Sequence, residues 1–142
     1  MTMKTLLRQL PLRLTAGGFL LNSGFNKIGA DKEAAAQLQG MATTAYPTLG
    51  KLDPDLFVKA LAAGEIATAA ALLIPFVPAA VAGAGLVAFS AGLVGMYLKT
   101  PGMRKEGSIR PTEQGVMLAK DVWLFGIGLS LTLDGLTAKN KR

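Results

Sequence analysis

Residues 56–74 read LFVKALAAGEIATAAALLI, and this stretch decides the fold. A helix that crosses a bilayer needs about 20 predominantly apolar residues, and the stretch has that length and character. Its single acid, Glu65, falls near the middle, where a carboxylate is costly unless a partner or water satisfies it. We therefore predict a membrane helix and place the candidate functional site around Glu65.

Three further apolar windows begin near Leu6, Ala79 and Val116. The composition agrees with a membrane protein, because 51% of the 142 residues are hydrophobic and 17% are charged, against about 25% charged in soluble domains. No stretch alternates polar and apolar residues as a barrel strand does, so helices must satisfy the backbone. The sequence predicts one all-α integral membrane domain (1–142), an antiparallel four-helix transmembrane bundle with helices at about 7–28, 54–74, 79–99 and 113–135.

The connection between the first two long helices is too long for a tight turn. Asp31 can cap a short helix there, in which apolar residues repeat at helical spacing: Ala34, Leu38, Met41 and Ala45. We expect this short helix to lie at the membrane interface. It either covers the mouth of the bundle or serves as a plain amphipathic connector.

Two local patterns refine the expected helices. Asp53 is a good N-cap with Pro54 at the first helical position, and Thr112 can cap the last long helix. In the third long helix small residues recur every fourth position, at Ala80, Ala84, Ala88 and Gly92. Such a row predicts the seam along which a neighbouring helix packs.

The chain contains neither cysteine nor histidine. Thiol redox chemistry, zinc sites built on thiolate or imidazole, and His-ligated haem are therefore excluded for the chain acting alone. Nucleophilic triads built on His or Cys are excluded for the same reason. We predict no metal site and no evident cofactor, and a redox role would use a bound quinone or a partner protein.

The net charge of +6 would raise the question of nucleic acid in a soluble protein. Here the cations flank the expected helices, as basic residues do when they anchor helices to anionic headgroups. No aromatic-interleaved basic face accompanies them, so we predict a lipid bilayer as partner and no nucleic acid. The flanking residues include Lys4, Arg8, Arg13, Lys99, Arg104, Lys105, Arg110, Lys139, Lys141 and Arg142.

Charged and amide side chains within the expected helices supply the candidate site. Adjacent helical residues point about 100° apart, so Lys120 and Asp121 each need a partner of their own. Because isolated ions are costly in lipid, we expect a buried charge and ligand network that links the first, second and fourth long helices. Its members are Arg13, Asn22, Asn26, Lys27, Glu65, Lys120 and Asp121.

The connection 100–112 is basic and rich in turn residues. A solvated loop is the simplest interpretation of this composition. Arg104, Lys105 and Arg110 could also form a site for an anion or a lipid headgroup.

Three motifs follow one another along the chain: Arg13-x-x-x-Gly17 leading to Gly24-x-x-Lys27, then Gly64-Glu65, then Lys120-Asp121. In this order they resemble the DoxX-like family of small four-helix membrane proteins. The similarity covers nearly the whole chain. It implies an antiparallel bundle in the plasma membrane with both termini cytoplasmic, and it implies a link to membrane redox systems. A simple count of the flanking cations on each side favours the opposite orientation. However, the cations at the first helix usually decide the orientation, and Lys4, Arg8 and Arg13 precede or begin that helix.

These observations leave two main functions open. The first is an accessory or docking subunit of a membrane oxidoreductase system, holding a quinone-like lipophile near Glu65 and Lys27. The second is a non-enzymatic structural or assembly partner of another membrane protein. A small-solute or proton transporter ranks third, because no repeated halves or broken helices are visible. Catalysis by the chain alone is not expected, because no nucleophile, metal or cofactor motif accompanies the acids and bases.

Overall fold

The computed structural model describes residues 2–139, apart from the side chain of Lys139, so the flanking cations Lys141 and Arg142 lie outside the described residues. The described chain is helical and has no strand; a single isolated bridge pairs Arg104 with Pro111. The predicted all-α class is therefore confirmed. Its elements are α1 (Met3–Ile28), α2 (Lys32–Ala45), the 3-10 helix η1 (Pro47–Lys51), α3 (Pro54–Leu73), α4 (Ala79–Lys99), α5 (Val116–Ala119) and α6 (Val122–Lys139).

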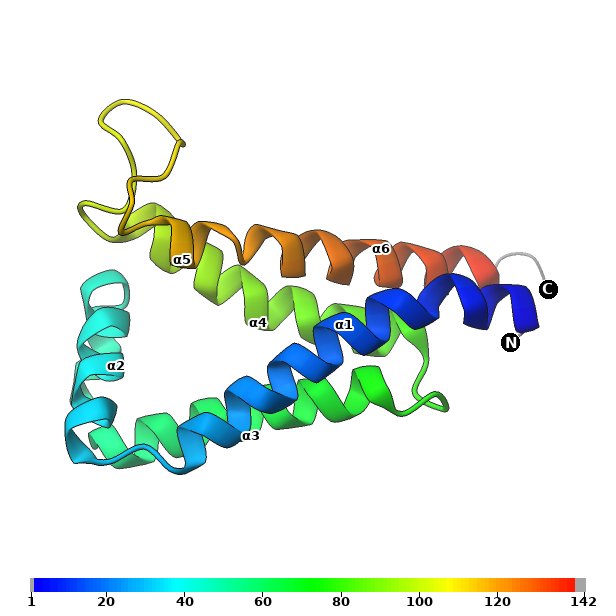
Figure 1. Ribbon diagram of the computed structural model, residues 1–142, viewed down its shortest axis with the longest axis horizontal. Helices are drawn as coiled ribbons and strands as arrows, with labels where there is room; N and C mark the ends of the chain where they lie inside the picture. Colours follow the sequence, from blue (N-terminus) through cyan, green and yellow to red (C-terminus); the bar gives the residue numbers. More distant parts are fainter. Residues whose placement is uncertain (1, 140–142) are drawn as a thin grey trace.

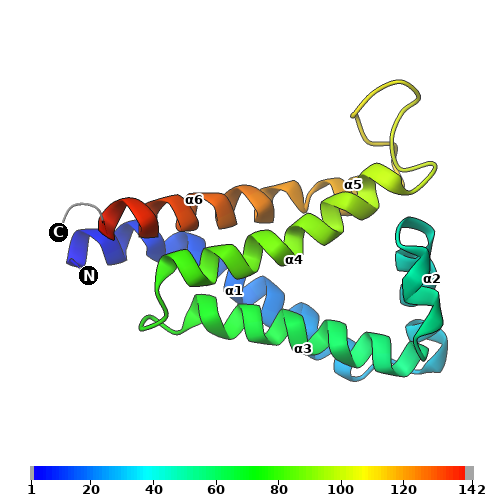
Figure 2. The ribbon, with the colours of Figure 1, turned by 180° about the vertical axis from the view of Figure 1, so that it is seen from behind.

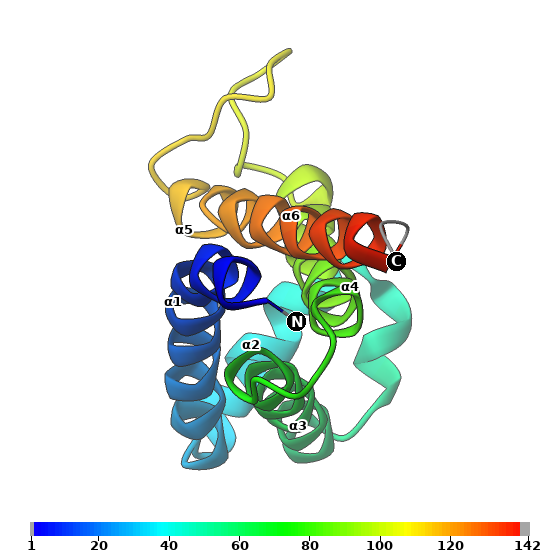
Figure 3. The same ribbon diagram turned by 90° about the vertical axis from the view of Figure 1, so that its right-hand side faces the viewer.

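The four long helices pack as two pairs, α1 against α3 and α4 against α6, and the two helices of each pair run in opposite directions (Figure 1). The pairs meet at the end where both termini lie and separate toward the other end, as the view from behind also shows (Figure 2). Seen from the termini, α1 and α4 lie on opposite sides, between α6 and α3 (Figure 3). At the far end α2 lies across the space between the pairs and contacts both α3 and α4.

Within the described residues, three segments are long and apolar enough to cross a membrane: Pro54–Leu73, Ala79–Lys99 and Val116–Ala138. This finding is consistent with a membrane protein. α1 has the length but is not among the three, because polar residues such as Arg13, Asn22 and Asn26 interrupt its apolar positions.

Glycines allow the close approach within each pair. A Cβ on Gly24 would lie 2.6 Å from the Ile66 side chain of α3, and a Cβ on Gly83 would lie 2.6 Å from the backbone nitrogen of Thr132. Neither position has room for a larger residue. The core beside these contacts is aliphatic and includes Leu20, Leu72, Leu86 and Leu131.

Two of the predicted helix ranges agree closely with the structure, and two need correction. Asp53 caps α3 as expected, and α4 has its predicted bounds. α1 begins earlier than predicted, because the Thr2 hydroxyl accepts the Thr5 amide and caps it. The fourth long helix is broken at Lys120 and Asp121, which lie between α5 and α6.

The ends of the fourth helix differ from prediction for local reasons. The Thr112 hydroxyl accepts the Gly115 amide, so it caps a turn ahead of α5. Asp134 and Gly135 do not end α6. Asp134 is held by side chains of α1, and Gly135 lets the α4 backbone approach, since its Cβ would lie 2.4 Å from the Ala80 nitrogen.

The short helix between the first two long helices is present, and Asp31 caps it. It buries Ala35, Gln39, Ala42 and Ala45, while Met41 of the expected apolar row is exposed. Gln39 donates to the carbonyls of Leu49 and Leu52, and Tyr46 donates to the carbonyl of Gly92 in α4 at 2.9 Å. These bonds hold α2 and η1 across the open end of the molecule.

The predicted seam of α4 is wrong in its middle and packs only at its ends, where Ala80 meets Gly135 and Gly92 accepts from Tyr46. Ala84 and Ala88 are exposed, and the buried face carries Ala82, Gly83 and Leu86 instead. Small residues recur on more than one side of this helix, and α4 approaches α6 closely where Gly83 meets Gly128 and where Ala80 meets Gly135.

Candidate functional site

An ion pair joins α1 to α3 in the interior. Lys27 Nζ lies 2.8 Å from Glu65 Oε1, and it also donates to Ser23 Oγ at 2.8 Å. Glu65 is only 3% exposed, and its second oxygen, Oε2, has no hydrogen-bond partner among the described residues. Gly24, one turn before Lys27, lets α1 approach α3 closely enough for the pair to form. The predicted meeting of Lys27 with Glu65 is therefore present.

Asp121 does not contact this pair. It is 8% exposed and lies at the break between α5 and α6. Its backbone bonds Leu118 and Phe125, but its carboxylate forms no hydrogen bond or ion pair with a described side chain. Lys120 lies over the Phe19 ring of α1, 5.2 Å from its centroid, where the ring face attracts a cation.

Arg13 is buried, but it belongs to a different part of the molecule. Its guanidinium donates to the carbonyls of Leu72 and Ile74 at 3.3 Å each and to that of Val77 at 2.7 Å. These carbonyls end α3 and form the joint to α4, where helical carbonyls lack partners and favour a cation. The prediction that Arg13 shares a network with Glu65 is wrong.

The two asparagines of α1 are also outside the network. Asn22 and Asn26 are exposed, and neither bonds a described side chain. Successive helical residues differ by about 100°, so turning Lys27 toward α3 turns Asn26 away from it.

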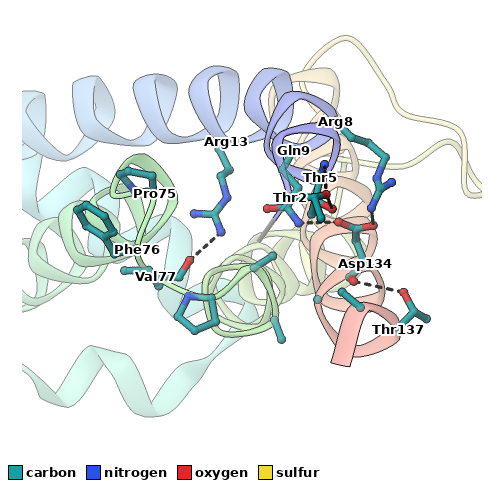
Figure 4. Close-up of a pocket in the computed structure, with 15 residues that line it drawn as sticks. Thr2, Thr5, Arg8, Gln9, Arg13, Pro75, Phe76, Val77, Asp134 and Thr137 are labelled. Carbon is teal, nitrogen blue, oxygen red and sulfur yellow. Dashed lines mark hydrogen bonds and ion pairs between the residues drawn. The ribbon is translucent and has the colours of Figure 1, made fainter. Parts of the chain in front are cut away.

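A second cluster, which the sequence prediction missed, lies where α1 begins and α6 ends. Arg8 forms an ion pair with Asp134, and Gln9 Nε2 donates to the other oxygen of Asp134 at 2.5 Å. Figure 4 shows Arg8 and Gln9 converging on Asp134, with Arg13 directed at the joint. The available signal was Asp134, the one acid in the apolar sequence of α6, which lies next to the predicted helix end at 135.

This cluster borders a cavity of about 630 Å³. Arg8, Gln9, Arg13 and Asp134 line one side, and the joint 75–78 with the start of α4 lines the other. No cavity was predicted at this end of the molecule.

The basic connection 100–112 extends from the body of the molecule (Figure 1). Arg104, Lys105 and Arg110 are all exposed, and Arg104 donates to the Leu98 carbonyl at 3.0 Å. Arg104 and Lys105 share a hollow of about 240 Å³ that Arg110 does not line. An anion or headgroup site formed by the three residues stays a prediction.

Among the described residues, no group of three or more acidic, histidine or cysteine side chains is arranged to hold a metal ion. No family model, curated protein or solved structure matches this chain.

Proposed function

We propose that the chain is a DoxX-like membrane protein that serves as an accessory or docking subunit of a membrane-associated oxidoreductase system. In this proposal α1, α3, α4 and the α5–α6 segment cross the plasma membrane as an antiparallel bundle with cytoplasmic termini. The observation that carries the proposal is the buried pair of Lys27 and Glu65, 2.8 Å apart.

The pair supports a fourth membrane span. A lysine or a glutamate inside a bilayer is costly alone, and each neutralises the other here. Arg13 is satisfied by carbonyls of the α3–α4 joint. With these two cations satisfied inside the protein, α1 can lie in the membrane despite its low hydropathy.

The same pair supports a quinone-like ligand. An ammonium group has three N–H donors, and Glu65 and Ser23 take two of those of Lys27. One donor remains on Lys27, and one acceptor, Oε2, remains on Glu65. A quinone offers carbonyl acceptors, and its reduced form offers hydroxyl donors, so the two forms match these two groups.

The test is gentle detergent extraction followed by identification of co-purifying lipids and proteins. We expect bound quinone in the wild type and its loss in Glu65→Gln and in Lys27→Met. Lys59→Gln is the matched control, because Lys59 forms an exposed pair with Asp55 on the same helix as Glu65. Equal quinone content in all four proteins, or no quinone in the wild type, would contradict the proposal that Lys27 and Glu65 bind a quinone.

A structural or assembly role is the second candidate, and one observation favours it. Lys27 pairs with Glu65, Arg8 pairs with Asp134, and Arg13 bonds carbonyls of the α3–α4 joint, so these charges also fix how the helices align. A stoichiometric membrane protein that co-purifies without a lipophile would support this role.

A transport role is the third candidate. The break at Lys120 and Asp121 interrupts a helix that the sequence predicted as continuous, and broken helices are frequent at transporter sites. It ranks below the other two because no repeated halves accompany the break.

A further inference from the structure

The cavity beside Arg8, Gln9 and Asp134 has the size of a ligand site. Its volume of about 630 Å³ lies within the range of about 300–1,000 Å³ that small-molecule sites occupy. A smaller hollow of about 290 Å³ adjoins the same three residues on their other side. The cluster therefore separates two recesses at the end of the molecule where both termini lie.

The walls of the cavity differ in character. Phe76, Val77 and Ala80 belong to the apolar wall, and Phe76 is 91% exposed. Arg8, Gln9 and Arg13 form the polar wall on α1, and Thr5 and Thr137 add hydroxyls. An apolar wall opposite a polar wall suits an amphiphile, with its chain on the first and its headgroup on the second.

The polar wall has an excess of positive charge. Asp134 is its one acid among the described residues, and Arg8 already pairs with it. Arg13, 3% exposed, bonds only neutral carbonyls and has no carboxylate partner among the described residues. The cavity therefore favours a ligand that carries negative charge.

Two buried polar atoms on this wall lack partners. Arg13 Nε is an unused donor, and Gln9 Oε1 is an unused acceptor, in side chains that are each 3% exposed. A buried polar atom without a partner is costly and marks a place where a ligand or water is expected. A ligand that satisfies both atoms carries an acceptor for the Arg13 guanidinium and a hydroxyl donor for the Gln9 amide oxygen.

We infer that this cavity binds the phosphate headgroup of an anionic phospholipid, of the phosphatidylglycerol type. The phosphate accepts from Arg8 and Arg13, a headgroup hydroxyl donates to Gln9, and the first part of the acyl chain lies against Phe76 and Val77. Long helices that cross a bilayer end at headgroup level, where basic recesses between helices bind such lipids. The inference does not depend on the redox proposal, because other residues form this site.

The test measures thermal unfolding of the detergent-solubilised protein during titration with phosphatidylglycerol, phosphatidylcholine or inorganic phosphate. We expect only phosphatidylglycerol to raise the melting temperature of the wild type at low concentration. Arg8→Gln should weaken its apparent affinity by about tenfold, because one charge-assisted contact is lost. Lys59→Gln makes the same charge change far from the cavity and should leave the affinity unchanged.

Asp134→Asn separates a ligand site from a structural cluster. It removes the acid that competes for Arg8, so phosphatidylglycerol should bind more tightly, whereas a purely structural cluster would give no gain in affinity. Equal responses to both phospholipids, or equal affinities in Arg8→Gln and Lys59→Gln, would overturn the inference. If inorganic phosphate raised the melting temperature as much as phosphatidylglycerol does, the lipid assignment would be wrong and the site would bind free phosphate.

Discussion

Glu65 and Lys27 depend on each other because each lies where a lone charge is costly. Breaking a buried pair by removing one partner typically costs about 3–5 kcal/mol, since the other charge stays uncompensated. We predict a loss near the lower end of that range for Glu65→Gln or Lys27→Met, because Lys27 retains some exposure. The measurement is the free energy of unfolding in mixed micelles with increasing denaturing detergent.

The double variant Lys27→Met, Glu65→Gln provides the control for that prediction. It removes both charges, so we expect its loss to be clearly smaller than the sum of the two single losses. The exposed pair of Lys59 and Asp55 supplies a reference cycle in which no coupling is expected. Additive losses at Lys27 and Glu65 would show that the pair is not coupled.

At the residue scale the sequence located one partnership and missed another. Glu65 was identifiable because a single acid interrupts an apolar stretch, and Lys27, near the end of the first helix, was one of the cations expected to meet it. Arg13, like Lys27, is a cation within the first helix. Its partners are backbone carbonyls of the α3–α4 joint, which no side-chain pattern reveals. Asp134 was missed because an Asp-Gly sequence also fits the end of a helix.

Among the elements, α4 and α6 depend on a glycine contact. A Cβ on Gly83 would lie 2.6 Å from the Thr132 nitrogen and 2.7 Å from the Gly128 oxygen, and backbone atoms cannot move aside easily. We predict that Gly83→Ala lowers the free energy of unfolding by about 1–3 kcal/mol, the usual cost of overpacking. Chemical or thermal denaturation in detergent measures this change in the free energy of unfolding.

Gly85, two residues along the same helix, is the matched control. A Cβ there would meet nothing within 4 Å, so Gly85→Ala should be neutral or should stabilise the helix by up to about 1 kcal/mol. Similar losses in both variants would mean that the loss does not come from the α4–α6 contact at Gly83.

The attachment of α2 rests partly on one hydrogen bond, from the Tyr46 hydroxyl to the Gly92 carbonyl at 2.9 Å. Tyr46→Phe should cost about 0.5–1.5 kcal/mol, the usual net contribution of one hydrogen bond. We expect the amides of α2 to exchange with deuterium faster while those of α3 keep their protection. Unchanged exchange in α2 would show that apolar contacts alone hold it.

Caps and prolines made the helix ends predictable, whereas the buried faces were not. Asp31, Asp53 and Pro54 act locally, so their effect can be seen in the sequence. Which side of α4 faces α6 depends on where two backbones come closest, and alanines on several sides give no clue to it. The break at Lys120 and Asp121 was likewise hidden, because neither proline nor glycine adjoins it.

At the scale of the whole molecule, two helix pairs join at the end with the termini, and α2 lies across the other end. The four apolar windows predicted the all-α class, and three of them coincide with the apolar spans, whereas the window near Leu6 does not. The proposed membrane role of α1 does not follow from its hydropathy; it is supported by the contacts that satisfy Lys27 at α3 and Arg13 at the α3–α4 joint.

The account therefore depends most on α1 crossing the bilayer beside α3. The chain has no cysteine, so single substitutions can be labelled with a membrane-impermeant maleimide in intact cells. Thr48→Cys and Glu106→Cys lie at the end opposite the termini and should react, whereas Thr2→Cys and Ala138→Cys should react only after lysis. Labelling of Thr2→Cys on the side opposite to Ala138→Cys would contradict the account, because α1 would then not cross the membrane.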